Sequence, residues 1–240
     1  MRLLFALAAT SALLVPPVLA QVSHGHHDHG QHAIPMPASG ASGASGASDH
    51  GEHSSHGHDV GPAGSTYDLR WIDAMVQHHT GALRMSEFVF NVGSPGVGAL
   101  ANTIWSDQAR EIKAMGQWRK AWYPQAPVYP VTLPPGGNPN SLAALRRMSP
   151  AQIEAMQMAG SAPTTETRVN WFLEGMLEHH GGALQMAHDA LRKSNNPTIH
   201  RLAREIIVAQ RREIIELRGM LRHDGFNKPA YYKYDALFSQ

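Results

Sequence analysis

Apolar side chains recur three or four positions apart in two long stretches of the chain, which is the spacing of one buried face on an α-helix. The first stretch predicts a helix of about six turns that begins at Thr66, with a capping box formed by Ser65 and Asp68. The buried face of this helix consists of Trp71, Ile72, Met75, His78, His79, Ala82, Met85 and Val89. The turn Gly93-Ser94-Pro95-Gly96 ends the helix, and its proline suits the first turn of the next one.

A second helix of the same kind is predicted to run to about Trp122. Its inward residues are again three or four positions apart and include two polar ones: Leu100, Ile104, Gln108, Glu111, Met115 and Trp118. A short connection makes the two helices antiparallel neighbours. Residues 123–140 carry six prolines and two adjacent glycines, and we therefore predict a loop with no regular structure there.

The same arrangement returns in the second half of the chain. The sequence Ser149-Pro150-Ala151-Gln152 predicts a capped short helix, and two long helices are predicted to follow over residues 166–193 and 198–222. Each hairpin has an apolar face that it cannot bury alone, so the two hairpins should pack on each other. The predicted fold is all-α: a four-helix bundle of the ferritin-like type, built from two antiparallel helical hairpins.

A string of two methionines and two adjacent histidines occurs in both hairpins, 101 positions apart and with the same spacing: Met75, His78, His79 and Met85, then Met176, His179, His180 and Met186. Downstream of each string a Gln-x-x-Glu sequence also recurs, with one residue inserted between: Gln108 and Glu111, then Gln210 and Glu213. We interpret the correspondence as an internal duplication.

Adjacent histidines on a buried helix face need partners, because an unsatisfied buried polar group costs about 1 to 3 kcal/mol. A metal ion would bind the unprotonated ring nitrogen, and the facing Gln and Glu side chains would hold the other ring N–H. Thioether sulfur suits Cu(I), and imidazole accepts Cu(I), Cu(II) and Zn(II), so the mixture favours copper over zinc. The predicted metal ligands are the eight methionines and histidines of the string, supported by Gln108, Glu111, Gln210 and Glu213.

The sequence also indicates export, and its charge balance argues against some partners. The positive start, the apolar run from Leu3 to Leu14 and the small residues up to Ala20 predict a signal peptide over residues 1–20, with an uncleaved anchor as the alternative. We therefore expect an exported protein, periplasmic or extracellular, without a membrane span in its mature form. Basic and acidic side chains number 20 and 19, a balance that argues against nucleic acid as a partner. The chain has no cysteine, so a metal must be held by other ligands.

Residues 21–64 are rich in histidine, glycine, serine and alanine, and we predict that they are disordered. Nine of the chain's 16 histidines lie there, and they either collect divalent metal loosely or belong to a solvated spacer. The predicted segments that follow are the first hairpin at 65–123, a Pro/Gly-rich linker at 124–148, the short helix with the second hairpin at 149–224, and a C-terminal tail at 225–240.

The pattern Met-x-x-His-His-x-x-Ala-x-x-Met, followed in the next helix by Gln-x-x-Glu-Ile, resembles the bacterial family called domain of unknown function 305. The resemblance covers residues 66–122 and 149–222 as two tandem copies, and it includes the Met148-Ser149-Pro150 sequence before the second copy. It implies a ferritin-like helical bundle, export, and, for some members, copper binding and copper resistance. Carried onto this chain, it implies that the eight methionines and histidines of the string are the functional residues.

These observations favour an exported copper-binding protein that sequesters or transfers copper in metal homeostasis and is not an enzyme. The alternative is a metal-free helical scaffold that binds another exported protein. In that case the Gln and Glu side chains satisfy the histidines, and the methionines are core residues. A ferritin-like di-iron oxidoreductase is less favoured, because it needs Glu-x-x-His on two helices and the chain contains no such sequence.

Overall fold

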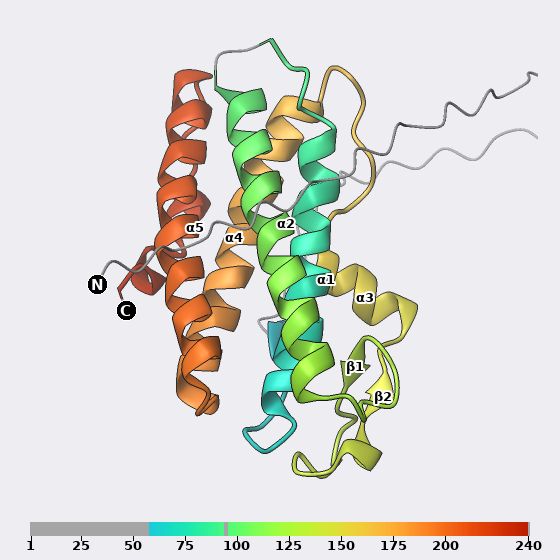
Figure 1. Cartoon of the computed structure of the whole chain (residues 1–240). Coiled ribbons are helices and arrows are strands. Elements are labelled where there is room, and N and C mark those ends of the chain that lie inside the picture. Colours follow the sequence, from blue (N-terminus) through green and yellow to red (C-terminus); the bar gives the residue numbers. More distant parts are fainter. Residues whose placement is uncertain (1–57, 94–95, 240) are drawn as a thin grey trace, which may run out of the picture. The chain divides into compact units, whose positions relative to one another are not determined.

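Four long helices dominate the structure, a computed structural model that describes residues 58–93 and 96–239 (Figure 1). They are α1 (Tyr67–Glu87), α2 (Val97–Trp122), α4 (Arg168–Lys193) and α5 (Pro197–His223), and the short α3 (Pro150–Gln157) lies between the two pairs in sequence. The prediction of a mostly helical fold is confirmed, and each long helix lies close to its predicted bounds. No helix in the described ranges combines the length and apolar character needed to cross a membrane.

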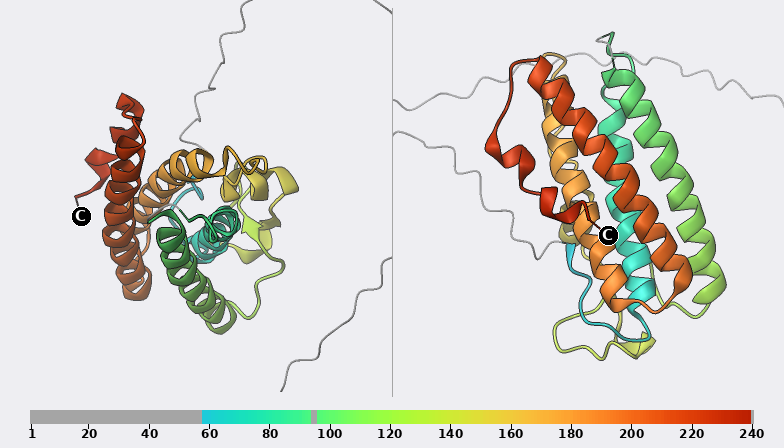
Figure 2. Two further views of the ribbon diagram at one scale, coloured as in Figure 1. Left: turned by 90° about the horizontal axis from the view of Figure 1, so that it is seen from above. Right: turned by 90° about the vertical axis from the view of Figure 1, so that its left-hand side faces the viewer.

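Helix α1 is enclosed by its neighbours, since it packs against α2, α3 and α4, while α5 packs mainly against α4 (Figure 2). Every residue from Trp71 to His79 is buried. We predicted one buried face for this helix, whereas this part of the helix is buried on all sides. The difference arises because α3 and the linker after α2 cover a side of α1 that would otherwise face solvent.

The linker after α2 contains a short antiparallel pair of strands, β1 (Val131–Thr132) and β2 (Arg146–Arg147). The prediction of a loop with no regular structure is therefore wrong at β1. The buried carboxylate of Asp73 in α1 accounts for the difference. It accepts hydrogen bonds from the backbone N–H of Val131 at 2.9 Å and from Nε of Arg119 at 2.6 Å. The linker is thus tied to both α1 and α2.

The two predicted helix caps have different outcomes. At α3 the capping box is present: Gln152 N–H donates to Ser149 Oγ at 3.2 Å, and Ser149 N–H donates to Gln152 Oε1 at 2.9 Å. At α1 the predicted box of Ser65 and Asp68 is wrong, because the N-cap residue is Thr66 and its side chain accepts no capping hydrogen bond from the helix backbone. The Ser65 hydroxyl instead donates to the backbone carbonyl oxygen of Asn140 at 3.1 Å, which fastens the start of α1 to the linker.

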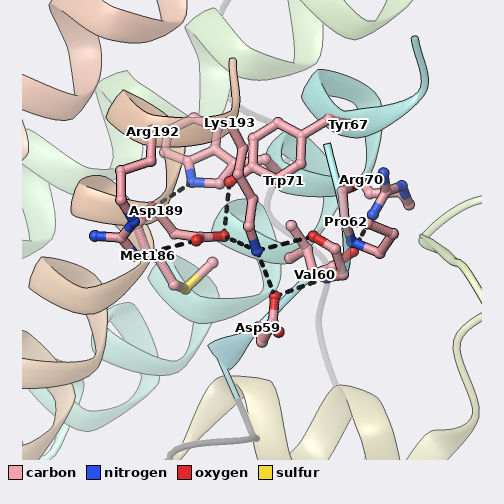
Figure 3. A network of polar contacts seen from close by, with 11 residues as sticks. Asp59, Val60, Pro62, Tyr67, Arg70, Trp71, Met186, Asp189, Arg192 and Lys193 are labelled. Atoms are coloured by element: carbon pink, nitrogen blue, oxygen red, sulfur yellow. Dashed lines mark hydrogen bonds and ion pairs between the residues drawn. The ribbon is translucent and has the colours of Figure 1, made fainter. Parts of the chain in front are cut away.

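The segment directly before α1, residues 58–64, has a defined position, although it belongs to the region predicted to be disordered. Buried Arg70 of α1 donates to the backbone carbonyl oxygens of Val60 and Pro62, and Lys193 of α4 lies 3.1 Å from the carboxylate of Asp59 (Figure 3). Composition did not indicate this anchoring, because it depends on two cations from helices that come later in the chain.

Several predictions concern residues outside the described ranges. They are the signal peptide, the His-rich segment as far as residue 57, and the place of Pro95 in the first turn of α2. These remain predictions.

Candidate metal centre

The two histidine pairs lie side by side on α1 and α4, and all four rings are fully buried. One histidine of each pair faces the other hairpin. The ring centroids of His78 and His179 are 3.8 Å apart, and His179 Nε2 lies 2.8 Å from the backbone carbonyl oxygen of His78. The structure thus brings the two halves of the repeated string together at the interface between the hairpins.

The second histidine of each pair faces the partner helix of its own hairpin. His79 Nε2 lies 2.5 Å from Glu111 Oε2 of α2, with the geometry of a hydrogen bond. His180 Nε2 lies 2.7 Å from Glu213 Oε2 of α5, an ion-pair distance whose angles are not those of a hydrogen bond. We expected both histidines of a pair to face these side chains, and only one does. Successive helix residues point about 100° apart, so neighbours in sequence reach different helices.

These contacts indicate which ring nitrogens carry protons. Carbonyl and carboxylate oxygens only accept hydrogen bonds, so the Nε2 atom that faces one is the N–H, and in a neutral ring Nδ1 then holds the lone pair. The Nδ1 atoms of His79, His179 and His180 are buried without a hydrogen-bond partner among the described residues. In its neutral form, each of these rings has a lone pair that a metal ion could use.

Burial favours the neutral form of the two central rings. It lowers the pKa of His78 well below its usual value of 6.5 by removing the ring from water, and the nearby rings of His179 and His58 lower it further. Burial also lowers the pKa of His179 well below 6.5, with further contributions from His180 and His79. A neutral imidazole is the form that binds metal. Both ring nitrogens of His78 lack a hydrogen-bond partner within the described part of the chain.

The methionines of the repeated string are all buried in the core that surrounds the histidines: Met75, Met85, Met176 and Met186. Their burial suits a thioether ligand and a core residue equally well. Within residues 58–93 and 96–239, no group of three His, Asp or Glu side chains is arranged to hold a metal ion.

The two glutamines do not have the predicted role. Gln108 is buried, yet neither its Oε1 nor its Nε2 has a hydrogen-bond partner in the described ranges, so it does not hold a histidine ring. Gln210 is buried as well, and its Oε1 also lacks a partner there. The central rings of His78 and His179 instead lie against each other.

Glycines beside the histidine pairs allow other parts of the chain to cover the centre. A Cβ atom on Gly81 would lie 1.7 Å from the carbonyl oxygen of Gln157 at the end of α3. A Cβ atom on Gly181 would lie 2.1 Å from the ring of Tyr234, whose hydroxyl donates to Glu178 at 2.9 Å. Helix α3 thus covers α1, and the C-terminal tail covers α4, next to the histidines. The sequence had left the role of the tail open.

Two side chains near the centre lie outside the repeated string. The ring centroid of His58 is 5.5 Å from that of His78, and His58 Nε2 lies 2.9 Å from Met158 Sδ. Repetition did not reveal these residues, because neither has a counterpart in the other hairpin. The composition of the His-rich segment was the only feature of the sequence that could have pointed to His58, the last histidine of that segment.

The comparisons with known proteins find a family model and several solved structures that are similar to part of the chain. The family model described as "Domain of unknown function (DUF305)" matches residues 68–221, from the first turn of α1 to the last turn of α5. No curated protein matches the chain. A DUF305 fragment from Deinococcus radiodurans is 27% identical with a TM-score of 0.48, covering 68% of this chain and 99% of that one. CopM in its Cu(I)-bound form is 24% identical with a TM-score of 0.47, covering 65% and 96%.

Proposed function

The chain belongs to the DUF305 family, and we propose that it binds copper between its helices and thereby sequesters or transfers copper outside the cytoplasm. The proposed ligands are the methionines and histidines of the repeated string: Met75, His78, His79, Met85, Met176, His179, His180 and Met186. The ion is the cargo of the protein, and the proposal includes no catalytic residue.

The observation that carries the proposal is the group of buried ring nitrogens without partners between α1 and α4. Each such atom costs on the order of 1 to 3 kcal/mol when it is left unsatisfied, and His78 has two of them. An ion that accepts the lone pairs would remove part of this cost. Glu111 and Glu213 support the proposal, because a carboxylate at the other ring nitrogen is the usual arrangement around a ligating imidazole.

Copper suits these donors better than zinc. Thioether and neutral imidazole are the ligands that Cu(I) accepts, whereas structural zinc sites use four ligands drawn mainly from Cys, His and carboxylates. The chain has no cysteine, and the described ranges contain no group of three His, Asp or Glu suited to a metal. Zinc would find an incomplete set of ligands here.

The architecture and location are also part of the proposal. The correspondence between the two hairpins supports a duplication of one hairpin into a ferritin-like four-helix bundle. Residues 1–20 would export the protein to the periplasm or the exterior. The His-rich segment would gather metal, and the buried centre would provide the selectivity.

Copper binding by the purified protein tests the proposal. Cu(I) is added without oxygen in competition with a chromophoric Cu(I) chelator, so that only tight sites are counted. We expect the wild type to take copper from the chelator, and a variant with glutamine at positions 78, 79, 179 and 180 to lose this ability. His223→Gln is the matched control, because the side chain of His223 is 89% exposed. Circular dichroism verifies that each variant keeps its helices. A quadruple variant that binds as tightly as the wild type would contradict the proposal.

A metal-free scaffold is the second candidate, and one observation favours it. His79 and His180 each have a glutamate within 2.7 Å, so these rings are partly satisfied without metal. Thermal melting distinguishes the candidates. A ligand that binds only the folded state stabilises it by about 2.7 kcal/mol at 100 times its Kd, so copper should raise the Tm of a copper protein by several degrees. An unchanged Tm with copper would favour the scaffold.

A further inference from the structure

The outer face of α5 carries a stripe of apolar and basic side chains. At 100° per residue, these exposed residues fall within about 100° of the helix circumference. Two of them are apolar, Val208 and Ile215, which are 51% and 52% exposed, more than any other large apolar residue in the described ranges. The others are arginines: Arg201, Arg204, Arg211, Arg212 and Arg222.

The positive charge of this stripe is only partly balanced on the same helix. The exposed acidic residues of α5 are Glu205 and Glu216, and both lie to one side of the stripe, about 60 to 80° around the helix from Val208. The helix thus exposes five arginines against two glutamates, whereas the whole chain is nearly balanced with 20 basic and 19 acidic side chains. An anionic surface would meet a local surplus of positive charge here.

The stripe belongs to one helix and not to a groove between elements. Helix α5 packs mainly against α4, which lies behind it in the right-hand view of Figure 2. A shallow hollow along the stripe is lined by α5 residues alone, between Arg204 and Ile215. A helical peptide is usually recognised in a groove that receives its apolar anchors. A bilayer surface needs no groove, only a face with apolar residues among basic ones.

The C-terminal tail adds aromatic side chains at the edge of the stripe opposite the glutamates. The guanidinium carbon of Arg218 lies 4.6 Å from the ring centroid of Tyr232, which is 38% exposed. Arg211 of the stripe donates to the backbone carbonyl oxygen of Phe238 at 3.3 Å. Tyrosine is enriched at the level of the lipid headgroups. The border of the stripe therefore suits the same kind of surface as its centre.

We infer that the outer face of α5 docks the protein onto the surface of an anionic phospholipid bilayer. The guanidinium groups pair with lipid phosphates, which arginine can contact through two parallel N–H···O bonds. Val208 and Ile215 lie between the headgroups, at the boundary of the acyl chains. This docking does not depend on copper, and it holds the exported protein at a membrane surface whether or not the ion is bound.

Co-sedimentation of the purified protein with lipid vesicles tests the inference. The protein is prepared without residues 1–20, the form expected after export, because their apolar run would bind lipid by itself. We expect binding to vesicles of phosphatidylcholine mixed with phosphatidylglycerol, no binding to phosphatidylcholine alone, and a loss of binding at high salt. A pH well above the usual histidine pKa of about 6.5 keeps the histidines of the His-rich segment neutral.

Two sets of substitutions separate the stripe from the net charge. Replacing three arginines of the stripe should weaken binding about 100-fold, since each basic side chain near an anionic surface strengthens it about five-fold: Arg204→Gln, Arg211→Gln and Arg212→Gln. The matched control removes the same charge from exposed positions of α2 and should lose far less: Arg110→Gln, Lys113→Gln and Lys120→Gln. Equal losses in the two triple variants would overturn the inference, because net charge alone would then explain the binding.

The apolar residues have their own test. Val208→Ser together with Ile215→Ser should weaken binding about 10-fold, because both side chains lose their contact with the acyl boundary. Val128→Ser, at an exposed apolar residue outside the stripe, is the control and should bind like the wild type. Circular dichroism verifies that each variant keeps its helices.

A fluorescent label is a second readout that requires no loss of binding. The chain has no cysteine, so Val208→Cys places one polarity-sensitive fluorophore on the stripe. Vesicles with phosphatidylglycerol should shift its emission to the blue, whereas the same label at Lys113→Cys should not respond. An unchanged emission at position 208 would overturn the inference. A shift with polyglutamate but not with vesicles would also overturn it, and would indicate an acidic protein as the partner.

Discussion

The buried central histidines should make the metal-free protein less stable as the pH falls below 6.5. In the unfolded chain, His78 and His179 bind protons near their usual pKa of 6.5, whereas burial in the folded protein holds both pKa values well below it. Below pH 6.5 the unfolded state therefore binds more protons than the folded state, and acid favours unfolding. Above pH 6.5 both rings are neutral in the folded and the unfolded state, so their contribution to the free energy of unfolding no longer changes with pH.

The size of this effect follows from the number of protons bound on unfolding. Each histidine that protonates only in the unfolded state lowers the free energy of unfolding by about 1.4 kcal/mol per pH unit. Both rings are fully buried, so together they contribute about 2.7 kcal/mol per pH unit, from just below pH 6.5 down to the folded pKa values. One pH unit would thus remove a sizeable share of a typical stability of about 5 to 15 kcal/mol.

Urea unfolding of the metal-free protein, measured from about pH 5 to pH 7.5 by circular dichroism, gives this slope. The rings of His58, His79 and His180 lie near the central pair and influence its pKa values. The informative quantity is therefore the difference in the pH slope of the free energy of unfolding between the wild type and the double variant His78→Gln, His179→Gln. The wild type should lose about 2.7 kcal/mol more per pH unit than the variant between pH 6 and pH 5. Parallel pH profiles for the two proteins would refute the argument from burial.

Two further substitutions, each with a control, test the contacts of α1 with its neighbours. Gly81→Ala should lower the Tm by several degrees, because its Cβ would lie 1.7 Å from the Gln157 carbonyl oxygen. The control Gly116→Ala meets nothing within 4 Å and should raise the Tm slightly. Equal effects of the two substitutions on the Tm would contradict the close packing of α3 on α1. Asp73→Asn should cost about 3 kcal/mol in urea unfolding, since it removes the negative charge that compensates the largely buried guanidinium of Arg119. Asp107→Asn, at an exposed pair, should change the stability by at most about 1 kcal/mol.

The helical hairpins were predictable because their signal is periodic and local. Apolar residues at helical spacing mark the buried faces of all four long helices, and Gly, Pro and Asn mark the turns. The histidine pairs were found for another reason, namely that the same string recurs in both halves. The cap at Ser149 was also readable, since both of its hydrogen bonds join residues three positions apart.

What the sequence left undetermined depends on the assembly of the helices. A helical stripe indicates that His78 and His79 are buried. It does not indicate that His78 faces the other hairpin while His79 faces helix α2 of its own hairpin. The buried carboxylate of Asp73 lies off the predicted stripe, and its partners are in α2 and in the linker. His58 looked like one of many histidines in a polar segment, because Arg70, which anchors that segment, carries no sign of its role in the sequence.

The position of His78 and His179 between the hairpins has a consequence for the order of folding. Helices α1 and α2, and likewise α4 and α5, are close along the chain, whereas these two rings are 101 residues apart. Contacts between nearby residues form faster than contacts between distant ones. Each hairpin can thus assemble early, with its imidazoles still hydrated, and the rings lose their water only when the two halves dock. An ion captured at that step would compensate for the lost hydration, so metal available where the exported chain folds would favour the docking of the two halves.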